Sequence, residues 1–261
     1  MIPKSYITNW SRFAPWSNNH LIEQDLIIER ALFNIFSDST LHQNLAFRGG
    51  TAIHKLFFKP QPRYSEDIDL VQINPEPIGD LLTLIRKQLD FLGTANYKKT
   101  LHNNTLTFVF NTEYEPVVPA KLKIEINTRE HFSVFGFKEI KREVNNQWFT
   151  ENYIIRSYSL EELIATKLRA LFQRRKGRDL FDIYYAANKT KLNIPNIIKA
   201  FHVYLENENL SISASEFIDN IEEKLTNELF TGDITGLIHP NIEYDHNIAW
   251  KLIKEKLIDK L

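Results

Sequence analysis

The sequence predicts an α+β fold in which a mixed sheet-and-helix domain is followed by a helical bundle. Up to about residue 126, short strand-like apolar runs are separated by prolines, which is typical of strands joined by loops. From Ser159 onward, apolar residues recur at helical spacing. We therefore expect a core domain over residues 1–157 and a helical domain over residues 158–261.

Bulk composition excludes several classes of protein. The chain has 261 residues with 43% hydrophobic and 25% charged residues, as expected for a globular protein with a sizeable core. A net charge of −1 gives no overall preference for nucleic acid or for an anionic membrane. Cysteine is absent, which excludes disulfides and thiolate nucleophiles. Without a signal core or an apolar run of roughly 20 residues, we expect a cytoplasmic protein with no membrane partner.

Elements of the first domain follow from periodicity. Apolar residues at helical spacing predict a helix over residues 18–36, and a second over 78–92 that ends at Gly93. The aromatic cluster of Trp10, Phe13 and Trp16 could stack on a base, although anchoring the terminus to the core is the favoured interpretation. Strands are expected over residues 45–48, 68–73, 95–102, 105–110 and 121–126.

Apolar residues at helical spacing predict helices throughout the second domain. Ser159 and Glu162 have the spacing of a capping box at the start of a helix. Four more helices are expected near residues 179–188, 194–206, 213–228 and 245–260. The last predicted helix is amphipathic, and we attribute its apolar face to packing within the bundle in preference to binding of a partner.

Two carboxylates share one face of a predicted strand. Alternation along a strand places Asp67 and Asp69 on one side while Ile68 and Leu70 point into the core. Close carboxylates repel each other unless a cation neutralises them, and oxygen ligands suit Mg²⁺ or Mn²⁺. In the run 121–126, Glu125 is a plausible third carboxylate from another strand. The alternative is a solvated strand end.

A glycine pair precedes a short predicted helix. Gly49 and Gly50 allow backbone N–H groups to approach a phosphate at a helix N-terminus, and Thr51 adds a hydroxyl. A tight turn is the simpler reading. Arg63 and Ser65, just before the aspartates, could contact phosphate or cap the loop.

A basic run is followed by two acids. Residues 167–178 contain six cations and no acid, and either bind phosphate or form a solvated helix surface. Asp179 and Asp182 lie one helical turn apart near the start of the next helix, where they could orient these cations or simply favour the helix dipole. The six cations are Lys167, Arg169, Arg174, Arg175, Lys176 and Arg178.

The order of these pieces resembles the AbiEii-type nucleotidyltransferase toxins, the group that includes the MenT toxins. The matching positions span residues 47–185. They are Gly49, Gly50, Thr51, Arg63, Ser65, Asp67, Asp69, Lys123, Glu125, Glu162, Lys167, Arg174, Lys176, Arg178, Asp179 and Asp182.

The resemblance implies a polymerase β-like nucleotidyltransferase core that moves a nucleotidyl group from an NTP to an acceptor hydroxyl, with a tRNA 3′ end as the expected acceptor. It also implies a type IV toxin–antitoxin or phage-defence (abortive infection) setting and an AbiEi-like antitoxin encoded nearby. Asp67, Asp69 and Glu125 would hold Mg²⁺ or Mn²⁺. Catalytic roles also fall to Lys167, Asp179 and Asp182, and nucleotide binding falls to Gly49, Gly50, Thr51, Arg63, Ser65, Arg174 and Arg178.

Three features depart from the family pattern. Thr51 stands where many members have serine, the loop from Gly50 to Asp67 is longer than in minimal enzymes, and Glu125 stands where aspartate is common. Three rival functions stay open at this point: a small-molecule nucleotidyltransferase of the antibiotic-modifying kind, a metal-dependent nuclease, and a nucleotide-binding module without chemistry.

Overall fold

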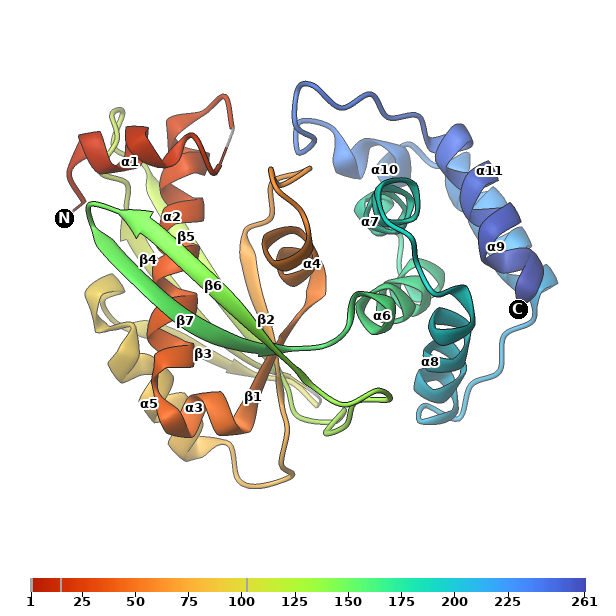
Figure 1. Ribbon diagram of the computed structural model, residues 1–261, viewed down its shortest axis with the longest axis horizontal. Helices are drawn as coiled ribbons and strands as arrows, with labels where there is room; N and C mark the ends of the chain where they lie inside the picture. The colour runs from red at the N-terminus through yellow and green to blue at the C-terminus, as the bar shows by residue number, and fades with distance from the viewer. Residues whose placement is uncertain (1, 15, 102) are drawn as a thin grey trace. The chain divides into compact units, whose positions relative to one another are not determined.

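The chain divides into two compact units, Met1–Tyr158 and Ser159–Leu261. The structure is a computed structural model, and it describes residues 2–14, 16–101 and 103–261. Figure 1 shows strands and helices in the first unit and helices in the second, which confirms the predicted α+β class.

Unit 1 is built on one seven-stranded mixed sheet with strand order β3-β4-β5-β2-β1-β7-β6. Antiparallel pairs join β1 to β2, β3 to β4, β4 to β5 and β6 to β7, whereas β2–β5 and β1–β7 are parallel. The strands are β1 Leu45–Arg48, β2 Asp67–Gln72, β3 Ala95–Lys99, β4 Asn103–Asn111, β5 Pro119–Asn127, β6 Lys138–Asn146 and β7 Phe149–Ser157.

Helices of unit 1 pack on this sheet. The long helix α2 contacts β7 and β5, and the short helix α4 contacts β1 and β2 (Figure 1). Both helices therefore contact a strand that carries predicted metal ligands, α2 through β5 and α4 through β2. The helical elements are α1 Lys4–Trp10, α2 Asn19–Ser37, α3 Ser39–Asn44, α4 Gly49–Phe57, α5 Gly79–Gln88 and the 3₁₀ turn η1 Asp90–Leu92.

The strands predicted over residues 45–48, 68–73 and 121–126 lie at the centre of the sheet, and those predicted over 95–102 and 105–110 lie to one side of it. Strand β1 has the predicted bounds, and β2 and β5 differ from prediction by one or two residues at each end. The strand expected over 95–102 ends at Lys99, and His102 lies outside the described residues. Trp10 is buried and its indole N–H donates to Asp25, which confirms that it anchors the terminus.

A hairpin of two long strands, β6 and β7, was not predicted. Its outer strand contains the consecutive charged residues Lys141, Arg142 and Glu143, so no apolar face is visible in the sequence. Strand β6 pairs only with β7, and β7 joins the sheet beside β1. An edge strand of this kind is stabilised by pairing and tertiary contacts rather than by hydrophobic periodicity.

Unit 2 is helical, as expected. Helix α6 contacts α7, α8 and α9, and α11 contacts α7. Ser159 caps α6 by accepting a hydrogen bond from the Glu162 N–H, while the Glu162 carboxylate is fully buried and accepts from the Tyr204 hydroxyl. The elements are α6 Leu160–Gln173, α7 Gly177–Lys189, α8 Ile194–Glu206, α9 Ala214–Leu225, α10 Glu228–Thr231, η2 Gly232–Ile234, α11 His246–Lys256 and η3 Ile258–Lys260.

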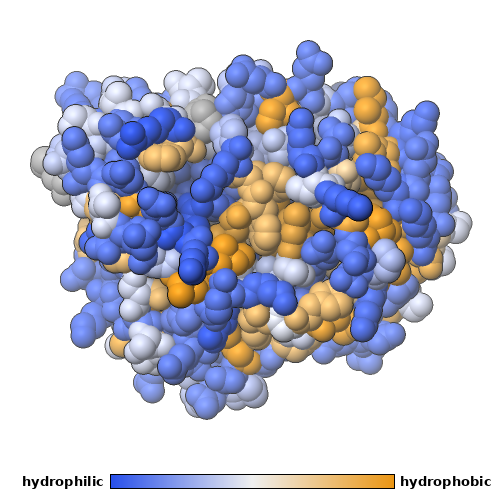
Figure 2. Space-filling model, viewed as in Figure 1, coloured by the Kyte–Doolittle hydropathy of each residue, from blue (hydrophilic) through white to orange (hydrophobic). Residues whose placement is uncertain are grey.

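Hydrophilic side chains cover most of the face drawn in Figure 2. Among the described residues, no helix has both the length and the apolar character that crossing a membrane requires.

Candidate active site

Four charged residues of unit 1 share one face of the sheet. In the parallel β2–β5 pair, Asp67 lies opposite Lys123 and Asp69 lies opposite Glu125. Paired positions in adjacent strands point to the same face, and so do residues two apart in one strand. The intervening Ile68 is fully buried, and Asp67 and Asp69 are half-buried. The predicted gathering of two aspartates and Glu125 on one face is therefore present.

Lys123 joins two of these carboxylates. Its Nζ lies 3.2 Å from Oδ2 of Asp67 and 2.9 Å from Oε2 of Glu125. Partial burial disfavours the ammonium charge, but the hydrogen bond that Lys123 donates to Glu125 and the charges of both acids outweigh burial and raise the pKa of Lys123. Lys123 therefore acts as the internal cation of the acidic cluster, a role that the sequence did not reveal.

Gly49 lies directly against Asp69. Its φ of +78° belongs to the left-handed region, and a Cβ placed on it would lie 2.1 Å from Oδ2 of Asp69. Only glycine fits this position, on both conformational and steric grounds. The glycine therefore brings the start of α4 against the carboxylate.

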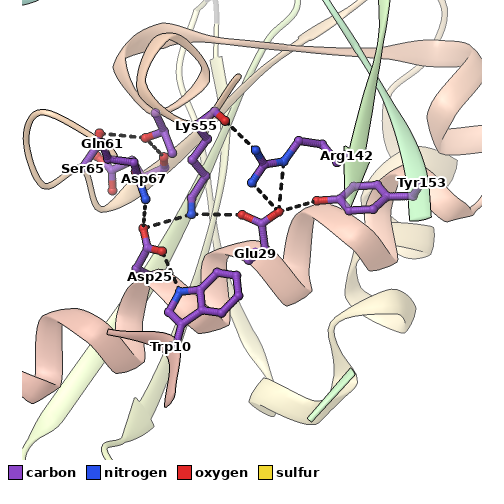
Figure 3. A network of polar contacts seen from close by, with 10 residues as sticks. Trp10, Asp25, Glu29, Lys55, Gln61, Ser65, Asp67, Arg142 and Tyr153 are labelled. Carbon is purple, nitrogen blue, oxygen red and sulfur yellow. Dashed lines mark hydrogen bonds and ion pairs between the residues drawn. The ribbon is translucent and has the colours of Figure 1, made fainter. Parts of the chain in front are cut away.

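The start of α4 is tied to β2 by one hydroxyl. Thr51 Oγ1 donates to the Asp67 carbonyl at 2.6 Å and lies 2.7 Å from Oγ of Ser65. Figure 3 shows Ser65 and Asp67 side by side at this point. The first backbone N–H groups of a helix have no acceptor within the helix, so the N–H groups from Gly49 to Thr51 are donors for an anion beside the two aspartates.

Arg63 is placed differently from the other predicted residues. Its side chain is only 2% exposed, and one guanidinium nitrogen donates to the carbonyl of Tyr64 at 2.8 Å. In this structure Arg63 therefore supports the loop before β2 from within the core.

The donor chemistry of the acidic cluster fits a magnesium ion. Mg²⁺ is commonly held by one or two carboxylates together with substrate phosphates and water. Asp67 and Asp69 supply two carboxylates on one face, with Glu125 beside Asp69 in the register. Over the described ranges, no three His, Asp or Glu side chains already have the arrangement of a complete protein cage. The set therefore suits an ion that the substrate shares.

A buried ion cluster occupies the candidate positions of unit 2. Lys167 Nζ lies 2.7 Å from Oδ1 of Asp179 and 2.9 Å from Oδ2 of Asp182, and both acids are fully buried. Burial opposes the charge of Asp179, yet Lys167 and Arg174 lower its pKa. The acids at the start of α7 therefore hold the cations that precede them.

The arginines and the remaining lysine of the basic run differ in exposure. Arg174 makes two hydrogen bonds to Asp179, at 2.6 and 2.8 Å, yet its side chain is 52% exposed. Lys176 and Arg178 both lie near Asp233, at 3.2 and 3.5 Å. Arg174 is therefore the cation of this group that Asp179 orients while leaving it open to solvent.

A second buried network was missed from the sequence. In Figure 3, Lys55 of α4 lies between two acids of α2, with its Nζ 2.9 Å from Asp25 and 3.1 Å from Glu29. Glu29 also accepts hydrogen bonds from Arg142 and Tyr153. The sequence signal was present, because Asp25 and Glu29 fall one turn apart within an otherwise apolar helical pattern.

The profile of the nucleotidyl transferase AbiEii toxin family, of the type IV toxin–antitoxin system, matches residues 30–252. The chain belongs to the AbiEii family. It is therefore a nucleotidyltransferase of the toxin type, as the order of its motifs predicted, and membership implies a nucleotide substrate and an antitoxin partner. No curated protein matches the sequence.

Solved structures show the same fold as this AbiEii-family chain. The toxin MenT4 from Mycobacterium tuberculosis has a TM-score of 0.63 at 13% identity, with 100% of this chain and 91% of MenT4 covered. JHP933 from Helicobacter pylori has a TM-score of 0.57 at 18% identity, with 93% of each chain covered. At these identities the likeness establishes the fold, which confirms the expected nucleotidyltransferase architecture.

Proposed function

We propose that the protein transfers a nucleotidyl group from an NTP to an acceptor hydroxyl in the presence of Mg²⁺ or Mn²⁺. The acceptor oxygen forms a bond to the α-phosphorus, the bond from that phosphorus to the bridging oxygen breaks, and pyrophosphate leaves. The acceptor proton passes to a base or to water. Membership of the family gives the reaction type, and this proposal adds the donor, the acceptor group and the ion.

One observation carries the proposal. Gly49 brings the N–H groups that open α4 against the carboxylate of Asp69, whose strand also holds Asp67. Phosphate donors and cation ligands therefore converge on one place, as a metal-bound triphosphate requires.

Within unit 1 each residue has a distinct role. Gly49, Gly50 and Thr51 bind phosphate oxygens through backbone N–H groups, and the hydroxyls of Thr51 and Ser65 fix the loop. Asp67 and Asp69 would hold the divalent ion, with Glu125 next to Asp69 as a third ligand or as the base for the acceptor proton. When bound, the ion supplies charge neutralisation on the transferring and leaving groups.

Within unit 2 the cations bind phosphate. We assign this role to Arg174 and Arg178, whose side chains are 52% and 33% exposed, and Asp179 orients Arg174 through its two hydrogen bonds. Lys167 is nearly buried, so we assign it mainly to holding Asp179 and Asp182 in place. The anion is the nucleotide or an RNA backbone.

We further propose that the acceptor is the 3′ end of a tRNA and that transfer arrests growth, as a phage-defence response in the cytoplasm. An AbiEi-like antitoxin would counteract it. Support comes from the toxin family to which the chain belongs.

The test is incorporation of label into RNA. Purified protein would be incubated with Mg²⁺, total bacterial tRNA and each labelled NTP in turn, alongside Asp67→Ala and Asp69→Ala. Asp80→Ala is the matched control, because Asp80 is an exposed acid in the first turn of α5. We expect label in tRNA with the wild type and the control and none with the two site variants.

Other outcomes separate the rivals. Pyrophosphate release without labelled RNA would indicate a small-molecule or protein acceptor, while shortening of RNA without NTP would indicate a nuclease. Nucleotide binding without pyrophosphate release would indicate a binding module. Full activity of both aspartate variants would contradict the site assignment.

A further inference from the structure

Unit 1 contains a pocket that the proposed reaction does not use. It lies at the end of α4 opposite to the Gly49–Thr51 turn and has a volume of about 390 Å³. We call it the Phe13 pocket. Its walls come from the segment after α1, the loop after α4 and strand β6, and none of Gly49, Thr51, Asp67 and Asp69 lines it. Pockets of this size suit small ligands.

Two of its walls are aromatic. Phe13 and Trp10 lie on one side with ring centroids 4.8 Å apart, and Phe58 belongs to the loop after α4. Phe13 is 43% exposed and can therefore be reached by a ligand. Trp10 is held in place behind it, because its indole N–H donates a hydrogen bond to Asp25. An exposed ring backed by a second ring is a platform on which a flat aromatic group stacks.

The pocket carries an excess of positive charge. Its lining includes four cations, Arg12, Lys55, Lys59 and Arg142, against the two acids Glu29 and Glu143. At the floor, Glu29 is already neutralised by Lys55 and Arg142, as Figure 3 shows. The charge left for a ligand therefore belongs to the outer cations.

Arg12 and Lys59 are these outer cations. The Arg12 guanidinium lies 4.8 Å from the centroid of the Phe13 ring and makes one hydrogen bond, to the Asn145 carbonyl. In the part of the chain that the structure describes, the exposed Lys59 side chain has no ion pair or hydrogen bond. An anionic group at the mouth would find both cations next to the aromatic wall.

We propose that the Phe13 pocket is a second binding site, for a ligand of the nucleotide class. A base stacks against the Phe13 ring and the Arg12 guanidinium that lies over it, and its phosphate meets Lys59. Such a ligand comes either as a free nucleotide or as an unpaired nucleotide of an RNA chain. The site is separate from the proposed transfer reaction, because it lies at the other end of α4 and shares none of the carboxylates.

The test is binding of AMP measured by calorimetry in the presence of EDTA. AMP has no pyrophosphate to release, so binding is read without turnover. Pocket variants are Phe13→Ala and Lys59→Glu. Matched controls are Phe91→Ala, because Phe91 is 40% exposed and also packs on a tryptophan, and Lys98→Glu, because Lys98 is an exposed lysine of strand β3.

We expect wild type, both controls and Asp67→Ala to bind AMP with equal affinity. Each pocket variant should bind about ten-fold more weakly, Phe13→Ala because it loses a stacking partner and Lys59→Glu because it places a negative charge beside the phosphate. Absence of binding by the wild type at millimolar AMP would overturn the proposal. So would loss of binding in Asp67→Ala with full binding in Phe13→Ala, or equal losses in Lys59→Glu and Lys98→Glu.

A short single-stranded RNA identifies the source of the ligand. Tighter binding than AMP, with the same sensitivity to Phe13→Ala and displacement of AMP, supports an RNA nucleotide. AMP binding that the RNA does not displace supports a free nucleotide. Because both readouts are binding, failure of the transfer assay leaves this test intact.

Discussion

Gly49 and Asp69 are packed so closely that a single methyl group on the glycine would lie 2.1 Å from the aspartate oxygen. The contact links the turn that opens α4 to the strand that carries both aspartates. In the proposed reaction the substrate phosphates and the ion that they share lie close to each other, and this contact brings together the residues that we propose to bind them.

We expect Gly49→Ala to destabilise the fold and abolish transfer. Positive φ alone costs a residue with a Cβ about 1–2 kcal/mol, and displacing Asp69 adds about 1–3 kcal/mol of overpacking. Gly136→Ala is the control, because Gly136 has a similar φ of +73° but nothing within 4 Å of its Cβ position. Urea unfolding of both variants separates the two costs. Equal free energies of unfolding would mean that the contact with Asp69 relaxes freely.

We predict that Lys123 and a divalent ion compete for the acidic cluster. We expect Lys123→Met to bind Mg²⁺ more tightly than wild type, because removing the ammonium leaves Asp67 and Glu125 without their neutralising charge. A larger rise in melting temperature on adding Mg²⁺ is the measurement, since an ion that binds the folded state stabilises it.

The control for Lys123→Met is Lys121→Met, two residues earlier on the same strand with an exposed side chain. It should respond to Mg²⁺ like wild type, and Asp67→Ala should lose the response. A smaller Mg²⁺ response in Lys123→Met than in wild type would show that Lys123 helps to assemble the ion site.

Lys167 lies in the buried cluster with Asp179 and Asp182. Helix propensity alone favours alanine at this position, but Lys167→Ala would leave two fully buried acids without their ammonium partner. Loss of one member of a buried ion pair costs about 3–5 kcal/mol. We expect this variant to melt early, whereas Lys251→Ala on the exposed face of α11 should not. An unchanged melting temperature would show that the stability of unit 2 does not depend on Lys167.

Much of the sheet centre could be predicted because its strands bury one side. In β5, Leu122, Ile124 and Ile126 are buried and alternate with polar residues, so their period of two is visible in the sequence. The same alternation placed Asp67 and Asp69 on one face. The β6–β7 hairpin escaped prediction because β6 is largely exposed and has no apolar face to detect.

The links between candidate residues could not be predicted from spacing. Lys123 was recognised as a position that matches the family pattern, but its bridge to Asp67 depends on the parallel register of two strands about 55 residues apart in sequence. Lys55 likewise meets Asp25, Glu29 and Arg142 only after α2 and β6 have packed on α4. Such contacts are set by tertiary structure, which periodicity does not encode.

Lys55 lies one helical turn after Thr51, so the buried network supports α4, the helix whose first N–H groups we propose to bind phosphate. We expect Lys55→Met to lower the free energy of unfolding by about 3–5 kcal/mol, because Asp25 and Glu29 lose a shared cation within the core. Lys4→Met, which removes an exposed ion pair with Glu115, should change stability little. Similar melting curves for the two variants would contradict a structural role for the buried pair.

Glu29 makes the stability of the fold sensitive to acid. Burial raises the pKa of this carboxyl, but Arg142 and Lys55 outweigh burial and lower it from 4.5 to about 2. A lowered folded-state pKa gives stability that is present above the unfolded-state value near 4.5 and is lost as pH falls toward 2. At about 1.4 kcal/mol per pKa unit this amounts to roughly 3 kcal/mol.

We therefore expect the difference in unfolding free energy between wild type and Glu29→Gln to be largest at neutral pH and to shrink between pH 4.5 and 2. Urea titrations at a series of pH values measure it. Glu139→Gln is the control, because Glu139 pairs with Arg156 and His42 at a half-exposed site where the effect should be small. A difference that stays constant from neutral pH down to pH 2 would show that the pKa of Glu29 is the same in the folded and unfolded states, and that Arg142 and Lys55 do not lower it.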